Sequence, residues 1–136
     1  MKICAPLFAL LLVPALAGAN VAWKTNYDSA LKIAKASKKP MMIDFRASYC
    51  GPCKAMDRKV YTDAEITALS AKFVPVQLDV EAKENQGLWK RFKNEALPTI
   101  VFLSADGKKV FSKSTGYLDV PGLKARMQGA LKQVRL

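Results

Sequence analysis

The sequence predicts an α/β fold in which a mixed central sheet is covered by helices on both faces. Three observations indicate this: helical and strand patterns alternate along the chain, helices separate the early strands, and a short turn joins the last two strands. A helix between two strands favours a parallel pair, whereas a hairpin makes its strands antiparallel. The 136 residues suit one domain with its own core.

The first nineteen residues differ from the rest of the chain. Lys2 gives a short basic start, residues 3–16 are almost wholly apolar, and residues 17–19 are small, as a signal peptidase requires. The apolar run contains two prolines and is shorter than the roughly 20 residues that a transmembrane helix needs. We therefore expect residues 1–19 to be a cleavable signal peptide and 20–136 to be the mature domain, without a transmembrane segment. The alternatives are an uncleaved anchor and a buried strand.

The first half of the mature chain contains one predicted strand and three predicted helices. Met41–Phe45 is an apolar run interrupted only by Asp44, which indicates a strand buried on both faces. Apolar spacing and capping residues predict the helices at Asp28–Ser37, about Cys53–Val60, and from the capping box Thr62-Asp63-Ala64-Glu65 to about Lys72. In the first helix we expect Asp28 or Ser29 as the N-cap and a helically spaced apolar set of Leu31, Ile33 and Ala34.

The second half contains three predicted strands and two predicted helices. In the first of these strands an early Pro75 predicts an incomplete hydrogen-bond ladder. The strands are expected at Phe73–Val80, Thr99–Leu103 and Lys109–Ser112, with a hairpin turn at 105–108. The helices are expected at Lys83–Phe92 and, capped by Asp119, at Pro121–Val134 with an apolar face of Leu123, Met127, Ala130, Leu131 and Val134.

Composition excludes several kinds of function. The chain has no histidine, which excludes catalytic triads that need an imidazole and metal sites that need histidine ligands. Its net charge is +11, but the basic residues are spread in short groups rather than clustered. We interpret them as solvated surface, and no nucleic-acid-binding signature accompanies them.

Two of the three cysteines stand only two residues apart, in Cys50-Gly51-Pro52-Cys53, and the third, Cys4, would leave with the signal peptide. A disulfide closing so small a loop contributes only about 2 kcal/mol to stability in the chain-entropy model. The pair therefore indicates redox chemistry. Half of a zinc site is disfavoured because four ligands are needed, and an inert disulfide remains as the structural alternative.

The expected position of the pair gives the two thiols different roles. Cys50 follows a buried strand and precedes a helix, whose free N–H groups and dipole favour the thiolate and lower the thiol pKa. Pro52 suits the first turn of that helix. Cys50 is thus expected to attack a substrate disulfide, and the shielded Cys53 to resolve the mixed disulfide.

Asp44 is the second candidate catalytic residue. If it is buried in its strand, its pKa should rise, and the carboxylate could then accept a proton from Cys53. The alternative is that Asp44 points outward at a sheet edge and is solvated.

The segment D-F-R-A-S-Y-C-G-P-C-K-A-M, residues 44–56, resembles the active-site segment of thioredoxins, whose C-G-P-C tetrapeptide is identical. Leu97-Pro98-Thr99 is similar to the cis-proline segment of that family, and Thr115-Gly116-Tyr117 to its late glycine turn. The resemblance runs from about Trp23 to the C-terminus and implies a thioredoxin fold. It departs from the family at Arg46, where an aromatic residue is usual, and at Gln77, in place of a lysine.

The resemblance implies the remaining site residues. Asp44 would be the buried carboxylate, Pro98 the cis-proline facing the disulfide, and the backbone at Leu97 would pair with an extended substrate segment. The other substrate-binding positions would be Tyr49, Gly51, Pro52 and Gly116. The stretch after Cys53 and residues 116–119 are also similar to the C-terminal periplasmic domain of the membrane reductase DsbD.

We therefore expect a periplasmic or secreted thiol:disulfide oxidoreductase that reduces disulfides of protein substrates. It would need no metal and no organic cofactor, because the redox equivalents reside on Cys50 and Cys53. Its partners would be protein thiols and disulfides, with a DsbD-type membrane reductase as electron donor, no nucleic acid, and a monomeric state. The alternatives are a disulfide oxidase or isomerase, and a non-catalytic redox-sensitive binding or assembly factor.

Overall fold

The computed structural model describes residues 20–135. The predicted signal peptide and Cys4 lie outside this range. The elements follow one another in the order that the sequence predicts: α1 (Tyr27–Ser37), β1 (Met41–Arg46), α2 (Gly51–Lys59), α3 (Ala64–Ser70), β2 (Val74–Asp79), α4 (Lys83–Arg91), β3 (Thr99–Leu103), β4 (Val110–Thr115) and α5 (Val120–Val134). Within the described residues, no helix is both long and apolar enough to span a membrane.

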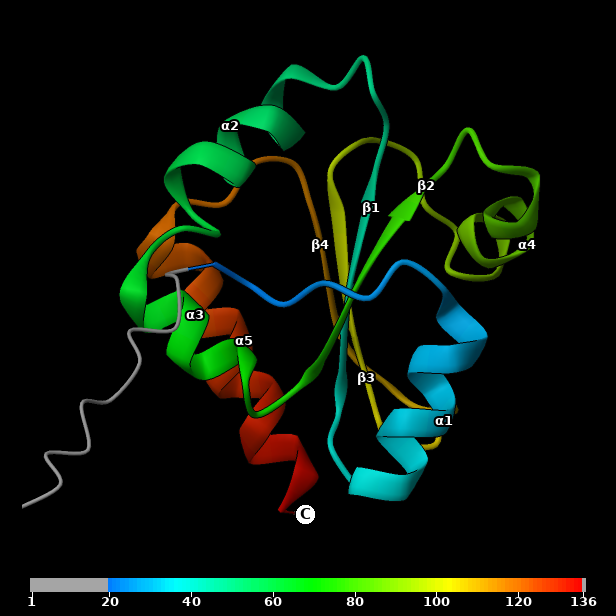
Figure 1. The fold of residues 1–136 in the computed structure, drawn as a ribbon, viewed down its shortest axis with the longest axis vertical. Coiled ribbons are helices and arrows are strands. Elements are labelled where there is room, and N and C mark those ends of the chain that lie inside the picture. The colour runs from blue at the N-terminus through cyan, green and yellow to red at the C-terminus, as the bar shows by residue number, and fades with distance from the viewer. Residues whose placement is uncertain (1–19, 136) are drawn as a thin grey trace, which may run out of the picture.

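The four strands form one mixed sheet in the order β2-β1-β3-β4 (Figure 1). β1 pairs in parallel with β2 and antiparallel with β3, and β4 closes the sheet as the antiparallel partner of β3. The helix-containing connection between β1 and β2 accounts for the parallel pair, and the short turn accounts for the hairpin. The predicted mixed sheet is confirmed.

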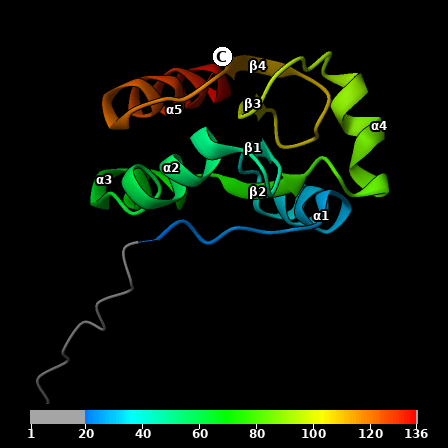
Figure 2. The same cartoon turned by 90° about the horizontal axis from the view of Figure 1, so that it is seen from above.

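Helices cover both faces of this sheet, as predicted. Figures 1 and 2 show α2, α3 and α5 on one face and α1 and α4 on the other. The core is correspondingly split into two clusters: Met42 packs with Met56, Ile66 and Leu123 on the first face, and Phe45 packs with Ala30, Ala34 and Phe92 on the second.

Strand β1 is buried on both faces, which confirms the interpretation of its apolar run. Because side chains alternate along a strand, Met42, Asp44 and Arg46 share one face, while Met41, Ile43 and Phe45 share the other. The first set faces α2, which carries the cysteines. Asp44 therefore lies on the face of the sheet that the redox helix covers.

Two predicted helix caps are wrong by one to three residues. Asn26, rather than Asp28 or Ser29, caps α1, because its side-chain oxygen accepts a hydrogen bond from the Ser29 N–H at 2.9 Å. At α3 the cap is Asp63, whereas Thr62 donates instead to the Arg58 carbonyl at the end of α2. In each case more than one residue that can cap a helix stands near its start, and the backbone conformation decides which of them does so.

Two other details of the prediction change in the structure. Ile33 is 42% exposed and Val134 is 47% exposed, so neither belongs to the core. Helix α2 begins at Gly51, two residues before the predicted start. The predicted gap at Pro75 in β2 is not contradicted, because proline has no N–H to donate; its carbonyl accepts a hydrogen bond from the Lys24 N–H at 2.9 Å.

The corrected cap of α3 makes a testable prediction. Asp63 accepts hydrogen bonds from the N–H groups of Glu65 and Ile66 at 2.9 and 3.1 Å. Asp63→Ala should lower the free energy of unfolding by about 1 kcal/mol, the usual value of such a cap, in urea titrations. Thr62→Ala is the matched control and should cost clearly less; an equal or larger loss would restore Thr62 as the cap.

Candidate active site

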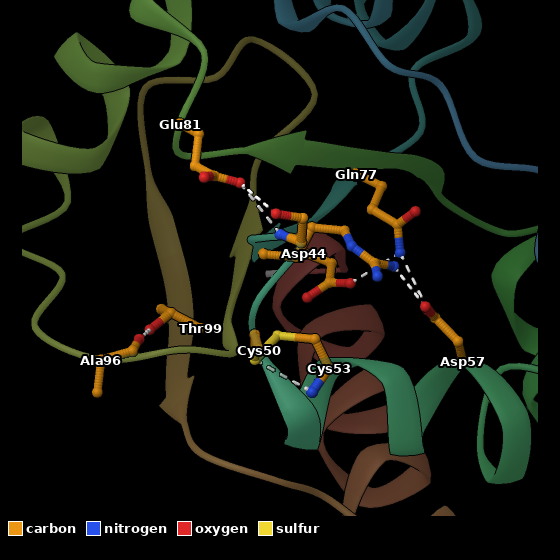
Figure 3. Close-up of a disulfide and its surroundings, with 10 residues drawn as sticks. Asp44, Cys50, Cys53, Asp57, Gln77, Glu81, Ala96 and Thr99 are labelled. Atoms are coloured by element: carbon orange, nitrogen blue, oxygen red, sulfur yellow. Dashed lines mark hydrogen bonds and ion pairs between the residues drawn. A yellow bond between two sulfur atoms is a disulfide. The ribbon is translucent and has the colours of Figure 1, made fainter.

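The two cysteines lie where β1 gives way to α2, and they form a disulfide (Figure 3). Cys50 is the N-cap of α2 with extended backbone angles, and Cys53 is in the first turn, with 5.3 Å between their Cα atoms. The Cys53 N–H donates to the Cys50 sulfur at 3.2 Å. Both side chains are buried. Cys50 is 6% exposed and Cys53 is 1% exposed, so Cys50 is only slightly more accessible than Cys53.

The residues between and before the cysteines form an exposed rim. Gly51 and Pro52 are exposed in the first turn of α2, where the missing N–H of proline leaves no intrahelical hydrogen bond unmade. Tyr49 is 72% exposed, which is unusual for so large an aromatic side chain. The rim therefore offers apolar surface next to the disulfide.

A second segment, before β3, packs against the disulfide. Leu97 contacts the buried cluster that Ala47, Cys50 and Cys53 form, and the Leu97–Pro98 peptide bond is cis, as the resemblance implies. The Thr99 hydroxyl donates to the Ala96 carbonyl at 2.6 Å and so closes the turn around Pro98 (Figure 3).

Gly116, in the predicted glycine turn at residues 115–117, contacts the cis-proline segment at residues 97–99. Its N–H donates to the Pro98 carbonyl at 2.8 Å, and its φ of +94° lies in the region that L side chains rarely adopt. Three segments far apart in the sequence thus meet: the cysteines contact Leu97, and Pro98 contacts Gly116.

Asp44 is 1% exposed, so the alternative of a solvated carboxylate at a sheet edge is wrong. Burial raises the pKa of Asp44 from 3.8 to about 7, although the hydrogen bond from Gln77 partly opposes the rise. The Gln77 amide nitrogen donates to Oδ2 at 3.1 Å, and Oδ1 has no hydrogen-bond partner among the described residues. In Figure 3 the carboxyl group lies between the disulfide and Gln77.

Tyr61 was not predicted as part of this site. Its side chain is 2% exposed, and its hydroxyl makes no hydrogen bond within residues 20–135. Burial, and then the negative charge of Asp44, raise the pKa of Tyr61 well above its usual value. No sequence signal distinguishes this tyrosine from a core aromatic residue, because its proximity to Asp44 arises only from the packing of the segment after α2.

A clamp that was also not predicted holds the loop before Cys50. The N–H and the hydroxyl of Ser48 both donate to one oxygen of Glu81, at 3.2 and 2.8 Å. Glu81 lies between β2 and α4, so the clamp ties the active-site loop to the neighbouring parallel strand (Figure 3).

In the part of the chain that the structure covers, no group of three or more Cys, Asp or Glu side chains is arranged to hold a metal ion. The redox-active groups at the site are the two sulfurs. Thiol–disulfide exchange is the chemistry that such a pair can perform.

Comparison with known proteins identifies the family. A family model described as "Thioredoxin-like" matches residues 22–105. The chain is 34% identical to the thiol:disulfide interchange protein DsbD of Ralstonia nicotianae over 79% of its own length, and 31% identical to that of Cronobacter sakazakii over 86%. It spans only 18% and 21% of those two relatives.

Solved structures agree with the sequence relatives. A thioredoxin from Thermus thermophilus superimposes with a TM-score of 0.74 at 25% identity, over 81% of this chain and 87% of that one. The structure of a DsbH oxidoreductase superimposes with a TM-score of 0.71 at 24% identity, over 90% and 92%. With a thioredoxin fold, a disulfide at the start of α2 and these relatives, the chain belongs to the thioredoxin-like family.

Proposed function

We propose that this protein is a thiol:disulfide oxidoreductase that reduces disulfide bonds of extracytoplasmic proteins. One observation carries the proposal: the Cys50–Cys53 pair lies at the N-terminus of a helix, next to the Leu97–Pro98 turn. The thioredoxin-like family and the similarity to DsbD support the same chemistry.

The reaction proceeds in two exchange steps. In the reduced protein, the Cys50 thiolate attacks one sulfur of a substrate disulfide, and the other substrate sulfur leaves as a thiolate. The Cys53 thiolate then attacks the Cys50 sulfur and displaces the second substrate thiolate. Two electrons pass to the substrate, which gains two thiols once its thiolates are protonated, and the protein is left with the Cys50–Cys53 disulfide.

The surroundings of the cysteines support these roles. The N-terminal end of α2 favours negative charge on Cys50, toward which the Cys53 N–H already points. Asp44 is buried with a pKa of about 7, so near neutral pH it can accept the proton that Cys53 must lose before the second step.

The substrate would bind across the rim beside the disulfide. An extended segment would pair with the backbone at Leu97, next to Pro98 and Gly116. Tyr49, Gly51 and Pro52 would contact it from the other side. These substrate-binding roles follow from the resemblance to thioredoxins.

We further propose residues 1–19 as a cleavable signal peptide and 20–136 as a monomeric periplasmic or secreted domain. A reductant outside the cytoplasm needs an electron donor, and a membrane reductase of the DsbD type is the proposed source. The Cys50–Cys53 pair would receive electrons by the same exchange chemistry, run in reverse.

The reduction potential of the pair tests the proposed direction. Because the C-G-P-C tetrapeptide is that of thioredoxin, we expect a value near the roughly −270 mV of thioredoxin, measured in dithiothreitol redox buffers on protein beginning at Asn20. A value near −120 mV, that of a strong oxidant, would reverse the direction of electron flow and favour the oxidase alternative.

A further inference from the structure

A chain of polar contacts leads from the buried Asp44 to the surface. Gln77 Nε2 donates to Asp44 Oδ2 at 3.1 Å and lies 3.4 Å from Asp57 Oδ1. The other oxygen of Asp57 forms an ion pair with Arg46 Nη1 at 2.6 Å. The side chains of Arg46 and Asp57 are 21% and 35% exposed, so the chain of contacts ends at the solvent.

The fold accounts for each member of this chain. Gln77 is the register partner of Asp44 in the parallel β1–β2 pair. Arg46 follows Asp44 by two residues on β1 and therefore shares its face. Asp57 follows Cys53 by four residues on α2, which places it one turn further along the same side of that helix.

The Gln77 amide is held in one orientation. Its NH₂ group has two hydrogens, one for each carboxylate. The opposite orientation would turn the amide oxygen, which only accepts hydrogen bonds, toward two carboxylates. Asp57, on the solvent side of Gln77, therefore disfavours the flipped amide orientation. Arg46 keeps Asp57 in place with a charge-assisted hydrogen bond.

The ion pair also places two opposite charges near Asp44. Asp57 raises the pKa of Asp44, whereas Arg46 lowers it, and both effects are smaller than that of burial. The other polar groups facing Asp44 are the Gln77 amide on β2, the Tyr61 hydroxyl and the sulfur of Cys53 on α2. Its register partner on β3 is the apolar Ile100.

We propose that the Arg46–Asp57 ion pair is a positioning device for Asp44: it fixes the Gln77 amide with its N–H toward the buried carboxyl, and its two charges oppose each other there. Arg46 and Asp57 do not touch the reacting sulfurs, so they act through Asp44 and Gln77. The importance of this device for catalysis rests on the proposed function, in which Asp44 accepts the proton of Cys53. The effect of the ion pair on the titration of Asp44 is independent of the proposed function.

The test is the titration of the Asp44 carboxyl carbon by NMR in the oxidised protein, in which the cysteines do not titrate. Arg46→Met leaves Asp57 uncompensated and should raise the midpoint by about one pH unit. Asp57→Asn should lower it by a similar amount. The double variant removes both charges but also releases the Gln77 amide, whose hydrogen bond lowers the pKa of Asp44, so its midpoint should lie above that of the unchanged protein and below that of Arg46→Met.

Lys124→Met is the matched control. It removes one positive charge from an ion pair with Glu65 that joins α5 to α3, away from Asp44. It should leave the Asp44 midpoint unchanged. Arg46→Lys keeps the charge, so its midpoint should stay close to that of the unchanged protein. If Arg46→Met does not fold, the lowered midpoint of Asp57→Asn still tests the inference.

A pair that only holds α2 against β1 would behave differently. The variants would then lose stability, but the Asp44 midpoint would stay within error of the unchanged protein, and the inference would be overturned. Insulin reduction by the same variants separates the two proposals. Shifted midpoints in a protein that reduces no disulfide would refute the proposed function alone.

Discussion

Cys50→Ser is expected to lower disulfide reduction by at least about 10³-fold, because the remaining thiol, Cys53, is only 1% exposed and is not at the N-cap of α2. Cys53→Ser should instead retain the first step. It would accumulate a mixed disulfide between Cys50 and the substrate, since the resolving thiol is missing. Insulin reduction measures the first effect, and mass spectrometry of the non-reduced protein detects the second as an added substrate mass.

The two serine variants control for each other, because each removes one sulfur and the same disulfide. If Cys53→Ser lost the first step while Cys50→Ser formed the adduct, the assignment of the attacking and resolving thiols would be reversed. If Cys50→Ser kept both partner binding and biological activity, the protein would be a non-catalytic redox-sensitive binding or assembly factor.

The order of the elements and the mixed sheet could be predicted because both depend on local patterns. Apolar runs, helical spacing and one short turn fix which strands are parallel without any knowledge of side-chain contacts. The C-x-x-C pair was found for the same reason: its spacing and its place before a helix are visible in thirteen consecutive residues. Helix boundaries were less certain, since Asn26 and Asp63 compete with neighbouring residues that cap equally well.

The environment of Asp44 could be predicted only in part. A carboxylate within an apolar strand indicates burial, but the partners of that carboxylate come from elsewhere in the chain. Gln77 approaches through strand register, Tyr61 through the turn after α2, and Asp57 through the helix itself. Arg46 stood out from the sequence only as a departure from thioredoxins, and its pairing with Asp57 depends on how α2 lies over β1.

Asp44→Asn is expected to stabilise the oxidised protein strongly at alkaline pH. The pKa of Asp44 is raised from 3.8 to about 7, so between these values the native state binds a proton that the unfolded state has lost. Stability therefore falls as the pH rises from about 4 to about 7 and stays low above that. At 1.36 kcal/mol per pKa unit, the buried carboxylate costs about 4 kcal/mol at pH 8.

Urea unfolding at pH 4 and pH 8 measures this effect. Asp44→Asn should resemble the unchanged protein at pH 4 and exceed it by roughly 4 kcal/mol at pH 8, since asparagine keeps the shape without the charge. Asp28→Asn, on the exposed side of α1, controls for the loss of one negative charge. A difference of the same size at both pH values would mean that packing, rather than ionisation, distinguishes the two side chains.

Asp44→Asn should also slow the step in which Cys53 resolves the mixed disulfide. Without Asp44, Cys53 loses the proposed acceptor of its proton, and resolution of the mixed disulfide near neutral pH should fall by on the order of tenfold to a hundredfold. The loss should shrink at high pH, where hydroxide removes the proton. Stopped-flow release of substrate thiol across the pH range measures both. Because the variant is more stable yet slower, a general loss of folding cannot explain the result, and an unchanged rate at neutral pH would remove Asp44 from the mechanism.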